Sequence, residues 1–244
     1  MITCAILTKT GGRQVNEDSV GVKETSGRII CVLADGLGGH NAGEVASSLA
    51  VESALKQFKD IGDMSCCEVL AACMDKAQSK IIEEQHRQNK IDEMKTTAVM
   101  LMIEENKAQW AHVGDSRLYV FENNEFVKRT LDHSVPQMLV LQGELREEEI
   151  RHHEDRNRLT RAMGTEWEKP MFVLSEPYTI SGRVSFLLCS DGFWELIDEN
   201  EMKKCHKKSS TPAEWLAKME KTVLRKGKKK NMDNYSAIAV FVRD

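Results

Sequence analysis

Five aspartates lie in short segments rich in Gly, Ser and Asn, where carboxylates could gather for chemistry. They are Asp18 in Asn16-Glu17-Asp18, Asp35 in Asp35-Gly36-Leu37-Gly38-Gly39-His40, Asp115 in Gly114-Asp115-Ser116-Arg117, Asp191 in Ser190-Asp191-Gly192, and Asp233 in Asp233-Asn234-Tyr235-Ser236. Each aspartate alone has an ordinary interpretation, because Asp-Gly is a common hairpin pair and Asp favours turns. Glu17-Asp18 alone could be an exposed loop.

The interpretation as turn residues is less convincing when the five aspartates are considered together. Asp35 and Asp191 each follow a strongly apolar segment, and the ends of such core strands cluster at one edge of a sheet. Several carboxylates meeting there would repel one another unless cations neutralised them. Oxygen ligands favour Mg²⁺ or Mn²⁺, and two such ions can activate water and offset phosphate charge. The pattern therefore indicates a divalent-metal centre suited to phosphoryl chemistry.

The elements that must position these residues follow from hydrophobic periodicity. Strands are predicted at residues 2–8, 29–34, 96–103, 108–113, 117–122, 126–129, 171–178, 183–189 and 237–242. Helices are predicted at 43–59, 66–88, 199–208 and 212–226, and residues 134–153 are mostly helical in pattern. Long meanders without regular βαβ alternation favour antiparallel sheets, with the helices on their outer faces.

Composition narrows the class of protein. The chain has 244 residues, 41% hydrophobic and 30% charged, with a net charge of −4, and no linker or repeat divides it. One globular domain is expected, and nucleic-acid binding is disfavoured because no basic excess is present. No apolar run reaches the ~18 residues of a membrane span, and the first residues do not resemble a signal peptide. Seven cysteines without a CxxC pair are typical of a reducing cytoplasm.

The motifs together resemble the PPM, or type 2C, serine/threonine phosphatases along nearly the whole chain, in the form of the bacterial branch. The matching segments occur in the family's order: Arg13 with Glu17-Asp18, Asp35-Gly36-x-Gly38-Gly39-His40 with Gly43-Glu44-x-Ala46-Ser47, Thr96-Thr97-Ala98, Gly114-Asp115-Ser116-Arg117, Asp132-His133-Ser134, Leu159-Thr160-Arg161-Ala162-x-Gly164, Ser190-Asp191-Gly192, and Asp233-Asn234-x-Ser236. A single Asp-Gly pair means little, whereas eight ordered matches are specific.

The resemblance implies an α+β fold, a four-layer α-β-β-α sandwich of two central antiparallel sheets flanked by helices, formed by residues 1–244 as a single PPM-type domain. It implies hydrolysis of phosphoserine and phosphothreonine by direct attack of a metal-bridging water at a binuclear Mn²⁺ or Mg²⁺ centre. The alternative is a catalytically silent, metal-binding regulatory relative. Loss of Asp35, Asp191 or Asp233 would favour that alternative, and all three are present.

The resemblance also implies a role for each residue. The implied metal ligands are Asp18, Asp35, Gly36, Asp191, Asp233, Glu17 and Asp115. Asp35 would bridge two ions, the Gly36 carbonyl would be a ligand, and Asp115 would hold a third, weaker ion. Arg13 would bind the phosphate through its guanidinium, and His40 would protonate the leaving oxygen. Asn234 and Asp132 would orient ligands or water.

Partners and remaining features complete the expectations. The resemblance implies phosphorylated proteins as substrates, a cognate Ser/Thr kinase, a monomeric enzyme, no nucleic acid and no membrane insertion. The alternative is a phosphatase that acts on an anti-sigma-factor antagonist rather than on a kinase and its substrates.

His152-His153 could be part of a solvated helix, or could contact the substrate from the region where the family carries a flap. The basic segments at 203–208 and 226–230 could be solvated, or could dock an acidic or phosphorylated partner.

Overall fold

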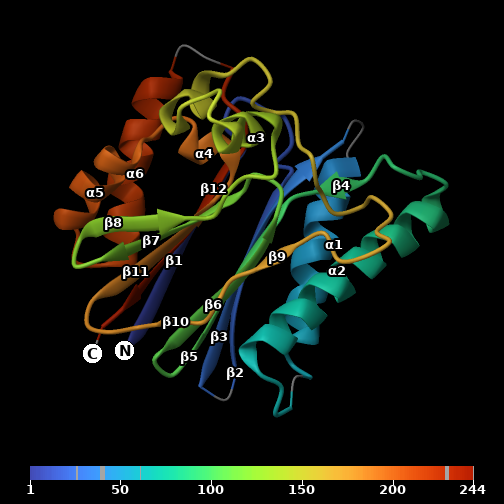
Figure 1. Ribbon diagram of the computed structural model, residues 1–244, viewed down its shortest axis with the longest axis horizontal. Coiled ribbons are helices and arrows are strands. Elements are labelled where there is room, and N and C mark those ends of the chain that lie inside the picture. The colour runs from blue at the N-terminus through green and yellow to red at the C-terminus, as the bar shows by residue number, and fades with distance from the viewer. Residues whose placement is uncertain (26, 39–41, 61, 229–230, 244) are drawn as a thin grey trace.

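The computed structural model describes residues 1–25, 27–38, 42–60, 62–228 and 231–243. Figure 1 shows two sheets standing face to face between two groups of helices. The strands are β1 (Ile2–Lys9), β2 (Asp18–Thr25), β3 (Arg28–Leu37), β4 (Lys95–Thr96), β5 (Ala98–Glu104), β6 (Lys107–Val113), β7 (Arg117–Glu122), β8 (Glu125–Arg129), β9 (Val173–Leu174), β10 (Tyr178–Thr179), β11 (Val184–Cys189) and β12 (Tyr235–Val242). The helices are α1 (Ala42–Gln57), α2 (Cys66–Gln88), α3 (Val135–Gln142), the 3₁₀ helix η1 (Glu147–His152), α4 (Asp191–Trp194), α5 (Glu199–Lys207) and α6 (Pro212–Gly227).

Both sheets are antiparallel, as predicted. The first has the strand order β1-β12-β11-β7-β8. The second has the order β10-β6-β5-β3-β2, with β4 paired to β3 and β9 paired to β6. The turn between β6 and β7 carries the chain from the second sheet to the first. The observed architecture confirms the predicted four-layer α+β sandwich.

The alternation of side chains along each strand creates three separate apolar layers. On β3, Cys31 and Leu33 face the first sheet, while Ile30 and Val32 face the helices. The central layer between the sheets is formed by Ile29, Cys31, Leu33, Val99, Leu101, Ile103, Leu118, Val120, Phe186, Leu188, Ile238 and Val240, among others. Since nearly every residue of β3, β5, β11 and β12 is buried on one face or the other, these strands are continuously hydrophobic in sequence.

Helices cover the two outer faces. The pair α1 and α2 packs on the second sheet through small and flexible side chains such as Ala46, Ala50, Cys73 and Met74. The pair α5 and α6 packs on the first sheet around the fully buried Trp215.

Side-chain caps define where three of these helices begin. Ser65 and Glu68 form a capping box on α2, and Asp198 and Glu201 form one on α5. Thr211 caps α6 before Pro212.

Three local predictions needed correction. Strand β2 was missed, because Asp18–Thr25 mixes polar residues with glycine at the edge of its sheet. The strand predicted over 171–178 is instead two short strands, β9 and β10, that pair separately with β6. The helical stretch predicted over 134–153 is broken by Gly143, whose φ of +78° ends α3 before η1 begins.

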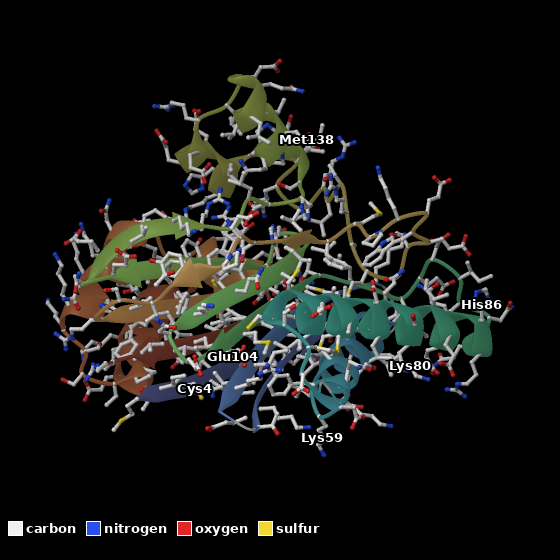
Figure 2. The ribbon with its side chains drawn as sticks, turned by 60° about the horizontal axis from the view of Figure 1, so that its bottom comes forward. Cys4, Lys59, Lys80, His86, Glu104 and Met138 are labelled. Carbon is white, nitrogen blue, oxygen red and sulfur yellow. The ribbon has the colours of Figure 1, made fainter. Side chains whose placement is uncertain are left out.

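The strand ends that carry the aspartates meet at one end of the molecule. In Figure 1 this is the end where α3, α4 and β4 lie, opposite the N- and C-termini. Figure 2 shows α3, marked by Met138, standing away from the sheets above that end. Within the described residues, none of the helices combines the length and apolar character needed to cross a bilayer.

Candidate active site

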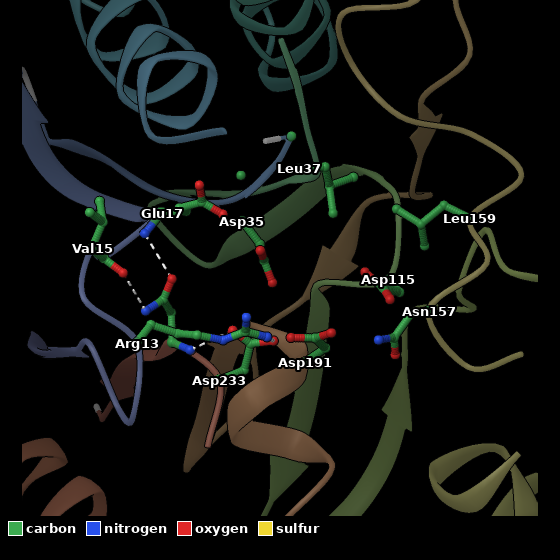
Figure 3. A pocket seen from close by; sticks show the side chains of 13 residues that line it. Arg13, Val15, Glu17, Asp35, Leu37, Asp115, Asn157, Leu159, Asp191 and Asp233 are labelled. Atoms are coloured by element: carbon green, nitrogen blue, oxygen red, sulfur yellow. Dashed lines mark hydrogen bonds and ion pairs between the residues drawn. The ribbon is translucent and has the colours of Figure 1, made fainter. Parts of the chain in front are cut away.

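A pocket of about 440 Å³ opens at this end of the sandwich. It is lined by Arg13, Val15, Glu17, Asp35, Gly36, Leu37, Gly38, Asp115, Asn157, Leu159, Asp191, Asp233 and Asn234. Figure 3 shows the carboxylates of Asp35, Asp115 and Asp191 directed into the shared space, with the Arg13 guanidinium beside Asp233. Six of the seven predicted metal ligands therefore line one pocket, and the seventh, Asp18, lies behind Asp35.

Asp18 and Asp35 are brought together by the pairing of β2 with β3. They are direct partners in the antiparallel register, Asp18 beginning β2 and Asp35 lying near the end of β3. Asp18 is buried, and its Oδ2 accepts a hydrogen bond from Ser190 Oγ at 2.8 Å. Its other oxygen, Oδ1, is buried without a hydrogen-bond partner among the described residues. The possible reading of Glu17-Asp18 as an exposed loop is thus wrong for Asp18.

Asp35 is held by the backbone around it, which leaves its carboxylate directed into the pocket. Its N–H donates to Thr97 Oγ1 at 3.0 Å, and its carbonyl accepts from Thr96 Oγ1 at 2.8 Å. Gly36 must be glycine, because a Cβ there would lie 2.2 Å from the Gly43 carbonyl at the start of α1. The close packing of β3 against α1 places the Gly36 backbone in the pocket wall.

Asp191 begins the short helix α4 directly after β11. Ser190 is the N-cap residue, and its hydroxyl accepts from the Ser236 N–H at 3.0 Å, which ties β11 to the start of β12. A Cβ on Gly192 would lie 2.1 Å from the Asn234 carbonyl. Ser190 and Gly192 therefore place the Asp191 and Asp233 segments side by side, which explains the Ser-Asp-Gly sequence.

Asp115 lies in the turn that connects the two sheets. Its carbonyl accepts from the Trp194 indole at 3.0 Å, and this Trp ends α4. The Arg117 guanidinium lies 3.4 Å from the Trp194 ring centre and binds Asp132 through Nε at 2.8 Å and Nη2 at 2.6 Å. Asp132 thus acts behind the pocket by holding Arg117.

Asn234 organises the segment that carries Arg13 and Glu17. Its Nδ2 donates to the carbonyls of Thr10 and Val15, both at 2.9 Å, and its Oδ1 accepts from the Glu17 N–H at 2.8 Å. These bonds fix residues 10–17 along the pocket edge. Arg13 itself is exposed and donates from Nη2 to Asp233 Oδ2 at 2.8 Å. The residue predicted to bind phosphate is therefore paired with a predicted metal ligand.

The carboxylates are electrostatically costly as a group. Burial raises the pKa of Asp18 to about 7. Burial, with the charges of Asp18, Asp191 and Asp115, raises the pKa of Asp35 well above its ordinary value. Burial and neighbouring carboxylates also raise the pKa of Asp115 and of Asp191. The common cause is negative charge removed from water and placed beside like charge.

The donor set fits a hard divalent cation. The pocket offers carboxylate and carbonyl oxygens, and Asp18, whose buried Oδ1 has no partner among the described residues, is the register partner of Asp35 in the pocket. Across the described ranges, no group of three His, Cys, Asp or Glu side chains already forms a cage around one ion.

Some residues of the pocket could not be recognised from the sequence, and one predicted residue is not among those that the structure describes. Asn157 and Leu159 close the pocket wall opposite Glu17, and nothing in their local sequence marks Asn157. The hydrogen bond from Trp194 to Asp115 joins residues 79 positions apart, so sequence alone could not show it. His40, the predicted proton donor, lies outside the described residues.

A pocket rich in carboxylate oxygens at the edge of a four-layer sandwich is typical of a site for hard divalent cations. The sequence profile of the protein phosphatase 2C family matches residues 10–234. The serine/threonine phosphatase stp of Listeria monocytogenes is 32% identical over 207 residues, covering 83% of this chain and 81% of that protein. The chain belongs to the protein phosphatase 2C family.

Solved structures agree with that assignment. The serine/threonine phosphatase PstP of Mycobacterium tuberculosis superposes with a TM-score of 0.86 at 27% identity, covering 100% of this chain and 99% of that one. The catalytic domain of PstP in complex with two manganese ions has a TM-score of 0.84 at 27% identity, with the same coverage. The bacterial type 2C resemblance is confirmed.

Proposed function

We propose that this chain is a protein serine/threonine phosphatase that removes phosphate from phosphoserine and phosphothreonine with the help of two divalent cations. The observation that best supports this proposal is that Asp35, Asp115, Asp191 and Asp233 line one pocket, with Asp18 directly behind. The fold that forms this pocket is shared with a phosphatase solved in complex with two manganese ions. A silent regulatory relative is disfavoured, because its defining losses at Asp35, Asp191 and Asp233 are absent.

The pocket's own residues supply ligands and orientation. Asp18, Asp35, Gly36, Asp191 and Asp233 are proposed to hold two ions, with Glu17 assisting from the pocket edge. When bound, two such ions would activate water for attack and neutralise phosphate oxygens. Every buried carboxylate whose pKa is raised here would be held ionised by the positive charge.

Arg13 and His40 are proposed to act on the substrate. Arg13 lies at the exposed edge of the pocket, and its planar guanidinium can bind two phosphate oxygens once it is released from Asp233. His40 is proposed to protonate the alkoxide leaving group of serine or threonine, a role that rests on its sequence motif. The Asn234 bonds to Thr10, Val15 and Glu17 would keep Arg13 near the reacting phosphate.

Several finer features belong to the same proposal. Mg²⁺ could replace Mn²⁺, because both prefer oxygen ligands, and Asp115 is proposed to hold a third, weaker ion. Residues 1–244 are proposed to act as one monomeric catalytic domain that dephosphorylates the substrates of a cognate Ser/Thr kinase. A cytoplasmic location is supported by the seven unpaired thiols, of which Cys4 and Cys67 are exposed.

The deciding experiment is hydrolysis of a phosphothreonine peptide by protein treated with a chelator, before and after Mn²⁺ or Mg²⁺ is added. We expect no activity without metal and restored activity with it, unchanged by alkylation of thiols. A folded sample that stays inactive with either ion would contradict the proposal and favour the silent relative. Activity lost on alkylation would instead indicate a cysteine nucleophile.

A further inference from the structure

A second hollow of about 420 Å³ adjoins the catalytic pocket, and we call it the accessory pocket. Four residues line both spaces: Arg13, Asn157, Asp191 and Asp233. A substrate held at the catalytic pocket therefore has a neighbouring space within reach of its next residues. An extended chain advances roughly 3.3–3.6 Å per residue, so a group one to three residues from the phosphorylated side chain could enter it.

One wall of the accessory pocket is basic. It comes from residues 151–161, which contain four arginines and two histidines but only two carboxylates, Glu154 and Asp155. Three of these cationic or ionisable side chains, Arg151, His152 and Arg156, line the accessory pocket. His152 belongs to the vicinal pair whose role the motifs left open, and it is exposed at the end of η1. The wall is thus available to a ligand from solvent.

Arg151 is a fixed cation. Its Nη1 donates to the Ile197 carbonyl at 3.0 Å and also to the Trp194 carbonyl, while Nη2 binds Glu199 at 2.5 Å. Only 10% of its side chain is exposed. These contacts hold a positive charge in place beneath the pocket surface.

Arg156 is the cation best placed to bind a ligand. Its Nε pairs with Glu195 Oε1 at 2.9 Å, and 39% of its side chain is exposed. A guanidinium has five N–H donors, so a pair made through Nε leaves capacity for a second acceptor. Glu195 also lines the accessory pocket and can orient Arg156 without using all its donors.

The remaining carboxylates of the pocket do not cancel this charge in the working enzyme. Asp191 and Asp233 are in the proposed metal set, where bound divalent ions would offset their charge. Glu195 is paired with Arg156. Gly227 at the end of α6 packs against Met232, which lines the pocket, and exposed Lys228 follows Gly227. With Asp191 and Asp233 offset by metal, three arginines remain against two carboxylates, Glu195 and the Glu199 that pairs with Arg151, so the charge around the accessory pocket is positive.

We propose that the accessory pocket binds a second anionic group of the phosphoprotein, one to three residues from the phosphate that is removed. This inference rests on the proposed phosphatase function. The shared chemistry is a carboxylate or phosphate that accepts hydrogen bonds from Arg156 and His152. The enzyme would thereby prefer phosphorylation sites in acidic or multiply phosphorylated segments.

The test compares three peptides with one sequence. The first has phosphothreonine among neutral residues, the second has glutamate two residues away, and the third has phosphoserine at that position. With Mn²⁺ present, we expect kcat/KM at the phosphothreonine to be about 10-fold higher for the anionic peptides, the effect of one charge-assisted hydrogen bond. For the third peptide, site-resolved mass spectrometry measures loss of phosphate from the phosphothreonine alone. Comparing the second peptide with the third shows whether the pocket prefers a carboxylate or a phosphate.

Substitutions in the accessory pocket test which residues cause the preference for anionic peptides. In Arg156→Gln and in His152→Gln, the anionic-to-neutral ratio should fall toward 1. The matched control is Arg158→Gln, on the same segment but outside the pocket lining, which should keep the wild-type ratio. Equal rates for all three peptides in the wild type, or an equal fall of the ratio in Arg158→Gln, would overturn the inference. A wild type inactive on every peptide would contradict the phosphatase function itself.

Discussion

At the scale of single residues, the site is a set of carboxylates held close against their mutual repulsion. Asp18 and Asp35 face each other across paired strands, and Asp191 and Asp115 raise the pKa of Asp35 further. In the metal-free protein these raised pKa values stabilise the fold at low pH. That stability is lost as the pH rises from the ordinary Asp pKa of ~4 through the raised values.

Asp35→Asn should therefore separate stability from activity. Without metal, the variant should unfold at a higher temperature than the wild type at pH 8, with a smaller difference at pH 5, because one buried charge is gone. With Mn²⁺, its turnover of a phosphothreonine peptide should fall by about 100-fold or more. Thermal unfolding at both pH values and steady-state kinetics check these outcomes.

The control for that variant is Asp63→Asn, an exposed carboxylate in the turn before α2 and outside the lining of the catalytic pocket. It should change neither the pH dependence of unfolding nor the turnover. Turnover by Asp35→Asn at the wild-type rate with Mn²⁺ would remove Asp35 from the metal set.

At the scale of elements, the four-residue helix α4 links two aspartates that come from different turns. Asp191 begins it and Trp194 ends it, and the Trp194 indole holds the Asp115 carbonyl. Arg117 stacks on the same ring and is fixed by Asp132. The spacing between the Asp115 turn and the Asp191 helix is thus set by the buried contacts of Trp194 with Asp115 and Arg117.

Trp194→Phe should loosen that spacing. Loss of the indole donor leaves a buried carbonyl unpaired, at a cost of about 1–3 kcal/mol. We expect a lower unfolding temperature and weaker binding of Mn²⁺ in a direct titration, with a higher metal concentration needed for half-maximal activity.

Trp215→Phe is the matched control for Trp194→Phe. The Trp215 indole also donates to a buried carbonyl, that of Met202 at 3.0 Å. Trp215, however, is a residue of α6 and lies in the outer apolar layer, between the helices and the first sheet. It should lose similar stability while leaving Mn²⁺ binding unchanged. Equal weakening of Mn²⁺ binding in both variants would mean that general destabilisation, rather than the Asp115 contact, is responsible.

At the scale of the whole molecule, the catalytic pocket joins the two sheets. Asp18 and Asp35 belong to strands of the second sheet, Asp191 and Asp233 adjoin β11 and β12 of the first, and Asp115 lies in the crossover between them. An ion bound among them would connect both halves of the sandwich. Unfolding of either sheet would then release the ion.

Divalent metal should accordingly stabilise the entire domain. At a Mn²⁺ concentration ~100 times its Kd, the gain is about 2.7 kcal/mol. For a chain of this length that corresponds to a rise in Tm of roughly 5–10 °C. Calorimetry before and after chelation measures it, and Asp35→Asn should show a smaller rise. An unchanged Tm in wild-type protein that binds Mn²⁺ would mean that the ion binds the unfolded chain as tightly as the folded one, which would contradict a site built by the fold.

The sequence by itself determined most of the elements and the candidate ligands. Apolar runs such as Ile29–Ala34 predict core strands without reference to their partners, and the ordered motifs that resemble the type 2C phosphatases named six residues that do line the pocket. The runs and the motifs can both be recognised in short segments, since side-chain alternation and turn chemistry depend on near neighbours, but the ligand roles come from the family resemblance.

Tertiary structure decided what depends on distant partners. The edge strand β2 exists because Asp18–Thr25 pairs with β3, although its mixed composition is weakly strand-like. Asn157 enters the pocket, His152 reaches the accessory pocket, and Trp194 binds Asp115 only because the fold brings remote segments together. Such contacts come from packing and register, which follow from the whole set of buried side chains rather than from any short segment.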